Sequence, residues 1–295
     1  MSVLIARLIA DAEGLSARID AVRADLEARG VRTAGVSMLD HCGETLEITS
    51  PDDDLAAMQD VLDTHFSPSD TLVARDVIQF PRLFVSDMDS TMIGQECIDE
   101  LADFAGLKEQ VAGITERAMQ GELDFESALR ERVRLLTDLP ESAIGECLSS
   151  RIVPMAGAAT LVATLRARGC RTVLVTGGFH HFADPIGEQL GFDHVVGNRL
   201  EVSAGKLSGG LVGGIVDSGV KQATLLTEAE ALGEDVITMA IGDGANDIPM
   251  IEAATYGFAY HAKPKARAAA NGRIDRGDLT KVLKLLGVPM RDWVG

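Results

Sequence analysis

The sequence of 295 residues has few cysteines and no long apolar segment. Its four cysteines are far apart and none forms a C-x-x-C pair; they are Cys42, Cys97, Cys147 and Cys170. This spacing is typical of neither a zinc site nor a disulfide framework, and it favours a reducing, cytoplasmic location. Since no run of about 18 uninterrupted apolar residues occurs, the sequence predicts no membrane-spanning helix.

Basic residues are also scarce: 27 lysines and arginines stand against 45 aspartates and glutamates, for a formal net charge of -18. Such a charge repels the phosphates of nucleic acid and of anionic membranes, so we exclude both as partners. A small anionic ligand is not excluded, because a few cationic side chains or a metal ion can dominate the field locally. We therefore expect any anion site to be a local cluster of such groups.

The first 77 residues have the pattern of a small two-layer domain. Apolar spacing predicts strands at 3–10, 31–38, 44–49 and 70–76 and helices at 13–29 and 52–65. The order β-α-β-β-α-β is that of a ferredoxin-like α+β domain. No cluster of histidine, cysteine and carboxylate in this region is typical of catalysis, and the run Asp52 to Asp54 is typical of a helix cap.

A different pattern begins near Phe80 and predicts a second domain over 78–295. Three apolar strands end in polar residues and glycine, and helices follow between them; the strands are 83–85, 172–175 and 236–241, and the helices 157–168, 181–190 and 220–232. This alternation predicts a three-layer α/β fold with a parallel sheet covered on both faces. In such sheets, ligands bind beyond the carboxyl ends of the strands.

The segment 94–153 interrupts this second domain after its first strand. Its apolar residues recur at helical spacing and it contains no convincing strand, so we expect a helical cap. The core of the domain would then consist of 78–93 and 154–295. Glycine-containing turns also predict a β-hairpin near 198–216.

Asp87 and Asp89 directly follow the first strand of this core. Where the chain leaves the pleated geometry, two carboxylates at i and i+2 can both face the ligand crevice. One can attack phosphorus to form an aspartyl-phosphate, and the other can protonate the leaving oxygen and then activate water. A structural interpretation stays open for this pair alone, because aspartates are common in loops and caps.

The third core strand ends in Gly242-Asp243-Gly244-Ala245-Asn246-Asp247, which offers hard oxygen ligands beside glycines. Mg²⁺ prefers one or two carboxylates together with waters and a phosphate oxygen. Asp87 and Asp243 with the Asp89 carbonyl would form part of such a shell, and we expect Asp247 to support it from behind. For Asn246 and Asp247 alone, a turn that caps a helix is an equally good interpretation.

Two further features can contact phosphate. Thr176-Gly177-Gly178 follows a strand and is predicted to open a helix, where a hydroxyl and backbone N–H groups would face an anion. Lys221, near the start of another helix, can neutralise a transferring phosphoryl group. Each also has a simpler interpretation, as an ordinary turn and as a solvated surface lysine.

In chain order, these features resemble the four signature motifs of haloacid dehalogenase-type phosphatases. The motifs are Asp87-Met88-Asp89-Ser90-Thr91, Thr176-Gly177-Gly178, Lys221 and Gly242-Asp243-Gly244-Ala245-Asn246-Asp247. Within that superfamily, the insertion resembles that of the phosphoserine phosphatase family. The matching segments are Ala118-Met119-Gln120-Gly121, Phe125, Leu129-Arg130-Glu131-Arg132-Val133 and Asp138-Leu139-Pro140. The resemblance covers about residues 80 to 290.

The resemblance implies a function and a set of roles. It implies Mg²⁺-dependent hydrolysis of O-phospho-L-serine to L-serine and phosphate, the last step of L-serine biosynthesis. Asp87 would be the nucleophile and Asp89 the general acid and base. The metal ligands would be Asp87, Asp243 and the Asp89 backbone carbonyl, with Asp247 assisting, and the phosphate ligands Thr176, Gly177, Lys221 and Asn246. Many relatives carry serine at the position of Thr176, which keeps the hydroxyl.

The resemblance also assigns four residues of the insertion. Glu96 would lie near the substrate ammonium and Arg132 would bind its carboxylate, while Met119 and Phe125 would line the cap. A zwitterionic amino acid needs one anion and one bidentate cation, which this pair supplies. Without the resemblance, Glu96 and Arg132 would be interpreted as charges on helix surfaces.

Two alternatives stay open. The substrate could be another phosphorylated amino acid, phosphothreonine or phosphohomoserine, because one methyl or methylene group gives only about 1–3 kcal/mol of discrimination. The chain could instead be a non-catalytic amino-acid sensor, since its N-terminal domain is similar in layout to ACT-like modules; the filled motif positions argue against this. Exposed strand edges also make a homodimer a further expectation.

Overall fold

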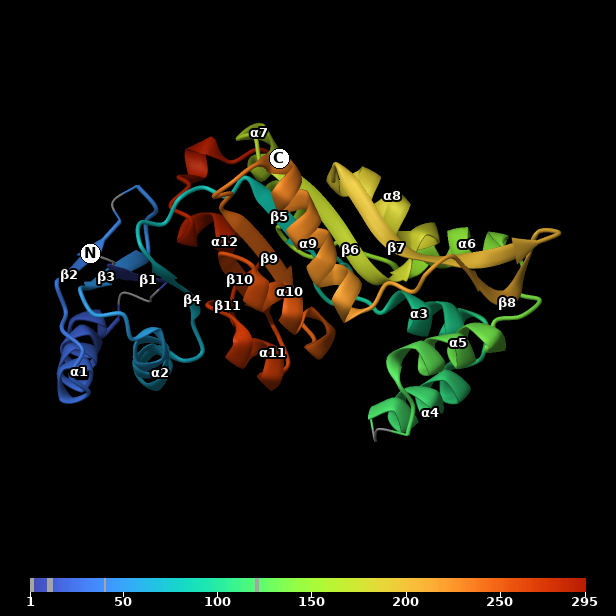
Figure 1. The fold of residues 1–295 in the computed structure, drawn as a ribbon, viewed down its shortest axis with the longest axis horizontal. Coiled ribbons are helices and arrows are strands. Elements are labelled where there is room, and N and C mark those ends of the chain that lie inside the picture. Colours follow the sequence, from blue (N-terminus) through green and yellow to red (C-terminus); the bar gives the residue numbers. More distant parts are fainter. Residues whose placement is uncertain (1–2, 10–12, 40, 120–121) are drawn as a thin grey trace.

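The computed structural model describes residues 3–9, 13–39, 41–119 and 122–295. Figure 1 shows an elongated molecule in which three parts follow one another along the long axis. The N-terminal α/β part lies at one end, the larger α/β core lies in the middle, and a group of helices lies at the other end. The functional residues predicted above come from the second and third parts.

The N-terminal part has the predicted β-α-β-β-α-β order. Its strands are β1 (Leu4–Ile9), β2 (Gly35–Met38), β3 (Thr45–Ser50) and β4 (Asp70–Arg75), and its helices are α1 (Leu15–Ala28) and α2 (Leu55–Phe66). Alternate residues of β1, namely Leu4, Ala6 and Leu8, form a buried core with α1 and α2. This is the period-2 alternation expected for a sheet with helices on that face.

The sequence did not predict how the two parts are joined. One 11-stranded sheet runs through both, in the order β2-β3-β1-β4-β11-β10-β9-β5-β6-β7-β8. The junction is the antiparallel pairing of β4 with β11 (Gly272–Ile274). The division of the chain into domains 1–77 and 78–295 stays a proposal. The sheet is continuous across the boundary between these two ranges.

Charged side chains reinforce this junction. Asp63 on α2 accepts hydrogen bonds from Arg267 Nη2 at 2.8 Å and from Arg273 Nη1 at 2.6 Å. Arg267 lies on α11 (Pro264–Ala269) and Arg273 on β11. Because Arg273 is only 6% exposed, its charge depends on this carboxylate for compensation. The N-terminal part therefore holds the end of the core that contains α11.

The core is a mainly parallel sheet. Its strands are β5 (Leu83–Ser86), β6 (Arg171–Phe179), β7 (His194–Ser203), β8 (Lys206–Val212), β9 (Thr238–Gly242), β10 (Tyr256–Tyr260) and β11. Its helices are α7 (Ala158–Ala167), α8 (His180–Leu190), α9 (Ser218–Leu232), α10 (Ile248–Ala253), α11 and α12 (Thr280–Leu285), with short 3₁₀ turns at Ala245–Asp247 and Met290–Asp292. Only β8 is antiparallel to its neighbour within this part.

Both faces of the core sheet are covered, as predicted. Phe84 and Leu174 pack in the cluster that contains α7, α8 and α12, whereas Leu83, Val85 and Val173 pack in the cluster that contains α9 and α10. Successive residues of a strand thus point to opposite helical layers. These buried apolar contacts make the sheet a rigid base for the residues at its carboxyl edge.

The predicted cap consists of four helices, α3 (Cys97–Phe104), α4 (Lys108–Met119), α5 (Phe125–Leu135) and α6 (Ser142–Arg151). Two antiparallel connections enter and leave it, with the N–H of Met155 bonded to the carbonyl of Met92 at 2.8 Å. The far end of the cap is held by the β7–β8 hairpin, since the N–H of Asp138 bonds to the carbonyl of Leu207 at 2.9 Å. Figure 1 shows α5 beside β8.

Two local predictions need correction. The predicted strand at 31–38 begins only at Gly35. Thr176, Gly177 and Gly178 do not open a helix; they are the last residues of β6 before Phe179, and α8 begins at His180. Within the described part of the chain, no helix combines the length and apolar character needed to cross a membrane.

Candidate active site

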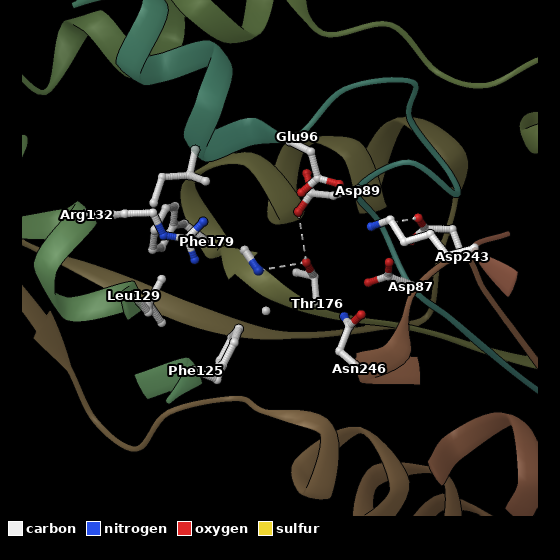
Figure 2. A pocket seen from close by; sticks show the side chains of 14 residues that line it. Asp87, Asp89, Glu96, Phe125, Leu129, Arg132, Thr176, Phe179, Asp243 and Asn246 are labelled. Atoms are coloured by element: carbon white, nitrogen blue, oxygen red, sulfur yellow. Dashed lines mark hydrogen bonds and ion pairs between the residues drawn. The ribbon is translucent and has the colours of Figure 1, made fainter. Parts of the chain in front are cut away.

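A cavity of about 290 Å³ lies between the carboxyl edge of the core sheet and the cap (Figure 2). Its walls combine acidic groups at the sheet edge with apolar and basic groups from the cap. The lining residues are Asp87, Asp89, Glu96, Ile98, Phe125, Leu129, Arg132, Thr176, Gly177, Gly178, Phe179, Asp243, Asn246 and Lys263. The cavity is therefore placed where the parallel sheet predicts a ligand.

Asp87 and Asp89 both reach this cavity from the end of β5. Asp87 continues the sheet, because its N–H bonds to the carbonyl of Ile241 at 3.0 Å, and it is only 3% exposed. Asp89 lies just beyond and accepts hydrogen bonds at both oxygens, from the N–H of Cys97 at 3.0 Å and from Thr176 Oγ1 at 3.3 Å. Asp89 thus links the first turn of the cap to the end of β6 (Figure 2).

Lys221 is buried behind Asp87 and does not line the cavity. Its side chain is 1% exposed, and Nζ donates to Asp87 Oδ1 at 2.5 Å and to Asp247 Oδ1 at 2.7 Å. Burial by itself lowers the pKa of Lys221, but the two carboxylates outweigh it and raise that pKa. Lys221 therefore stays charged and fixes the orientation of the Asp87 carboxylate.

Asp247 is fully buried and supports the same cluster. Its second oxygen, Oδ2, accepts the N–H groups of Asp243 at 3.2 Å and Gly244 at 3.0 Å. A Cβ on Gly242 would lie 2.4 Å from the Asp247 Cγ, so only glycine fits beneath this carboxylate. Asp247 both forms the turn and pairs with Lys221. The two interpretations of this segment, a turn and a support for the acidic cluster, therefore both apply.

The acidic cluster can hold a cation. Asp87, Asp243 and Asp247 each offer an oxygen within 4.8 Å of the others. Burial raises the pKa of Asp87 well above its usual value, and burial also raises the pKa of Asp89 and of Asp243. One buried lysine, Lys221, is shared by Asp87 and Asp247, so the cluster of three carboxylates keeps a net negative charge that a divalent cation with hard oxygen ligands would compensate.

Thr176, Gly177 and Gly178 form a bulge at the end of β6. Thr176 Oγ1 accepts the N–H of Gly178 at 2.8 Å and donates to Asp89. A Cβ on Gly178 would lie 2.8 Å from Asp89 Oδ2, and one on Gly177 would lie 3.2 Å from the Phe125 ring. The missing side chains therefore allow both the general acid candidate and the cap to approach this backbone closely.

The cap contributes one carboxylate and one guanidinium. Glu96 Oε1 accepts a hydrogen bond from Ser90 Oγ at 2.8 Å, and burial of the carboxyl group with the neighbouring Asp89 raises the pKa of Glu96 to about 7. Arg132 lies across the cavity (Figure 2). Its Nε is buried and has no hydrogen-bond partner among the described residues, and burial lowers its pKa. A buried guanidinium Nε without a hydrogen-bond partner favours an anionic ligand at this position.

Most residues predicted for the site come together in space. Those that line the cavity are Asp87, Asp89, Glu96, Phe125, Arg132, Thr176, Gly177, Asp243 and Asn246, and those behind it are Lys221 and Asp247. The side chain of Met119 lies outside the described part of the chain, so its predicted contact is not described. Their individual roles are proposals.

Sequence reasoning missed Lys263. This residue follows β10, lines the cavity, and has its Nζ 3.7 Å from Asp243 Oδ2. Strand β10 was not among the predicted elements, although Tyr256–Tyr260 is a short apolar run of the kind found in buried strands. Recognising that strand would have placed Lys263 at the same sheet edge as Asp87 and Asp243.

Comparison with known proteins agrees with this geometry. The haloacid dehalogenase-like hydrolase family model matches residues 84–252. A phosphoserine phosphatase of Streptococcus thermophilus is 47% identical over 205 residues, which cover 69% of this chain and 95% of that protein. The chain belongs to the phosphoserine phosphatase family of haloacid dehalogenase-like hydrolases.

Two comparisons with Vibrio cholerae extend the family assignment. Its phosphoserine phosphatase is 45% identical over 211 residues, covering 71% of this chain and 64% of the longer relative. A solved probable phosphoserine phosphatase from that organism, in unliganded form, aligns over 98% of this chain and 88% of its own, with a TM-score of 0.72 and 35% identity. The likeness in fold therefore includes the N-terminal part, which lies outside the family-model match at 84–252.

Proposed function

We propose that this chain hydrolyses O-phospho-L-serine to L-serine and phosphate. The observation that carries the proposal is the pairing, in one cavity, of the Asp87 and Asp89 carboxylates with Glu96 and the buried, unpaired Nε of Arg132. The first pair provides a nucleophile and an acid for a phosphate ester, and the second matches an ammonium and a carboxylate. The family relatives named phosphoserine phosphatase support the same substrate.

The first step forms an aspartyl-phosphate. An Asp87 oxygen attacks phosphorus while the bond from phosphorus to the serine oxygen breaks, and Asp89 gives its proton to that oxygen. Burial raises the pKa of Asp89, which favours the protonated form that this step requires. In the second step, Asp89 takes a proton from water, whose oxygen attacks phosphorus and releases Asp87 and phosphate.

Magnesium is part of this proposal. The donor set fits it, since Asp87, Asp243 and the Asp89 carbonyl offer hard oxygen atoms and Asp247 is already occupied by Lys221 and two N–H groups. When bound, Mg²⁺ supplies positive charge against the phosphoryl oxygens. Asp247 and Lys221 hold the carboxylates in place around it.

The cap excludes water from the reaction. Phe125 contacts the end of β6, because its ring carbon would lie 3.2 Å from a Cβ on Gly177. This contact places the cap beside the region where phosphate binds, and closure of the cap over the substrate would exclude water there. The described structure thus represents the cap resting on the core.

The test is phosphate release from O-phospho-L-serine, phosphothreonine, phosphohomoserine and a sugar phosphate, each with Mg²⁺ and with excess EDTA. We expect a magnesium-dependent preference for O-phospho-L-serine and no turnover by Asp87→Asn. Asp60→Asn, whose side chain is 64% exposed on α2, is the matched control and should be fully active. Equal rates on all four substrates would refute the specificity, and no release from any would favour the sensor alternative.

We further propose a cytoplasmic location and a homodimer. All four cysteines are buried free thiols, which suits a reducing compartment. Strand β2 ends the sheet and leaves one edge open, which offers a pairing surface for a second copy. The mass in solution, measured by light scattering during gel filtration, distinguishes a dimer of about twice the 31.3 kDa chain from a monomer.

A further inference from the structure

Asn198 has no role in the function proposed above, yet it is 1% exposed and uses its whole amide. Its Nδ2 donates to the carbonyl of Gly177 at 2.8 Å, and its Oδ1 accepts the N–H of Val216 at 2.8 Å. The donor and acceptor ends of the amide are defined by these partners, because a carbonyl needs a donor and an N–H needs an acceptor. Asn198 therefore joins two segments that lie beside the cavity.

The first segment is the bulge at the end of β6. Val175 pairs with Val196 and Phe179 pairs with Asn198, so residues 176–178 stand opposite the single residue Gly197. Such a bulge removes backbone pairing, and the freed groups must find other partners. The Asn198 amide provides one of them, since it takes the place of a strand neighbour at the Gly177 carbonyl.

This hydrogen bond determines which side of one peptide faces the cavity. In a trans peptide, the carbonyl of Gly177 and the N–H of Gly178 point in opposite directions. The carbonyl points to Asn198, and the N–H points to Thr176 Oγ1, whose hydroxyl also contacts Asp89. Two adjacent glycines would otherwise let this peptide turn over at little cost, which would aim a carbonyl oxygen at an anion.

The second segment leads into α9. Val216 precedes Asp217, which caps this helix by accepting the N–H of Val220 at 2.9 Å. Lys221 follows within the first turn and reaches Asp87. Asn198 thus connects the bulge, which lines the cavity, to the start of the helix that carries the lysine.

We propose that Asn198 is a positioning residue of the phosphate site: its amide keeps the Gly177 carbonyl turned away from the cavity and ties the bulge to the start of α9. This inference rests on the proposed function, because it assigns phosphate to the bulge. It makes Asn198 act through the Gly177–Gly178 peptide and not by touching substrate.

The test uses substitutions that remove the hydrogen-bond donor of the Asn198 side chain. Asn198→Asp keeps an acceptor for Val216 but cannot donate to Gly177, and Asn198→Ala removes both ends. We expect the Kd for inorganic phosphate in Mg²⁺, measured by calorimetry on the full chain, to rise about 10- to 100-fold, as when an oriented donor is lost. The Kd for L-serine should change by less than about threefold, because the cap residues that bind it are not touched.

The matched control is Thr172→Val, at the opposite end of β6. It removes a partly buried hydrogen bond that Thr172 Oγ1 donates to Asp193 at 3.0 Å, and it should leave both affinities unchanged. A folded Asn198→Asp protein with the wild-type phosphate Kd would overturn the proposal, as would equal losses for phosphate and L-serine. A wild-type protein that binds phosphate but releases none from O-phospho-L-serine refutes the proposed substrate and leaves this test intact.

If neither variant folds, an NMR measurement on the wild-type protein tests the positioning role of Asn198. In ¹⁵N-labelled protein, the Asn198 side-chain amide should be protected from hydrogen exchange and should shift together with the Gly178 amide when phosphate is added. An Asn198 amide that exchanges as fast as an exposed one, or that is unaffected by phosphate while Gly178 shifts, would contradict the positioning role.

Discussion

Lys221→Met is the sharpest test of how the acidic cluster is held together. Methionine matches the length of lysine but removes the charge that contacts Asp87 at 2.5 Å and Asp247 at 2.7 Å. Because all three side chains are at most 5% exposed, the variant leaves two buried carboxylates without a cation. Breaking a buried ion pair in this way costs about 3–5 kcal/mol of folding free energy. At roughly 2–4 °C per kcal/mol for a protein of this size, Tm should fall by about 6–20 °C.

The control is Lys263→Met, which removes an equal charge beside the same cluster. Its side chain is 66% exposed and its Nζ is 3.7 Å from Asp243, so its loss should cost no more than about 1 kcal/mol. Urea denaturation at pH 7 in EDTA compares the two variants directly. A Lys221→Met protein that unfolds within about 1 kcal/mol of the wild type would refute the reasoning.

A double variant and a pH series sharpen the same test. Lys221→Met combined with Asp247→Asn removes one of the two uncompensated carboxylates, and we expect it to regain stability but no activity. Burial already raises the pKa of Asp87, so folded Lys221→Met binds a proton there that the unfolded chain does not. Its stability should therefore rise as the pH is lowered from 7 toward 5 and fall as the pH is raised. No such pH dependence relative to wild type would contradict an uncompensated Asp87.

Three further predictions concern the cavity. The pKa of Glu96 is about 7, and only the deprotonated form of Glu96 attracts the substrate ammonium. The value of kcat/KM for O-phospho-L-serine should therefore rise as the pH is raised through about 7, and Glu96→Gln should flatten that rise. Arg132→Lys should raise KM for O-phospho-L-serine by more than about tenfold while p-nitrophenyl phosphate, which has no carboxylate, is hydrolysed at nearly the wild-type rate. Gly178→Ala should lower kcat by about tenfold, because its methyl group would lie 2.8 Å from Asp89 Oδ2; an unchanged kcat would mean that Asp89 can shift freely.

Local pattern was sufficient for much of the fold. The alternation in β1 and the apolar runs at β5, β6 and β9 correspond to strands, and the spacing in 94–153 corresponds to four helices. The carboxylates of the site followed as well, because they come just after strands that could be recognised by themselves. Asp87, Asp89 and Asp243 are examples: the parallel sheet brings the ends of β5 and β9 to one edge.

Elements without a strong local signal were missed. Strand β11 has three residues and α11 has six, too few for a periodic pattern, and their place depends on pairing with β10 and β4. The helix predicted to open at Thr176 was wrong for a related reason, since the bulge exists only because β6 is held against β7.

The sequence alone determined the chemical groups of this site and the strands that present them, because motif spacing and apolar periodicity are local properties of the chain. Tertiary structure decided how these groups are used. Lys221 became a buried partner of Asp87 across 134 residues, and Asn198 came to orient the Gly177 carbonyl across 21. The physical reason is that burial and hydrogen-bond partnership depend on which distant segments the fold brings together, so neither the raised pKa values nor the orientation of a peptide can be found from one residue and its neighbours.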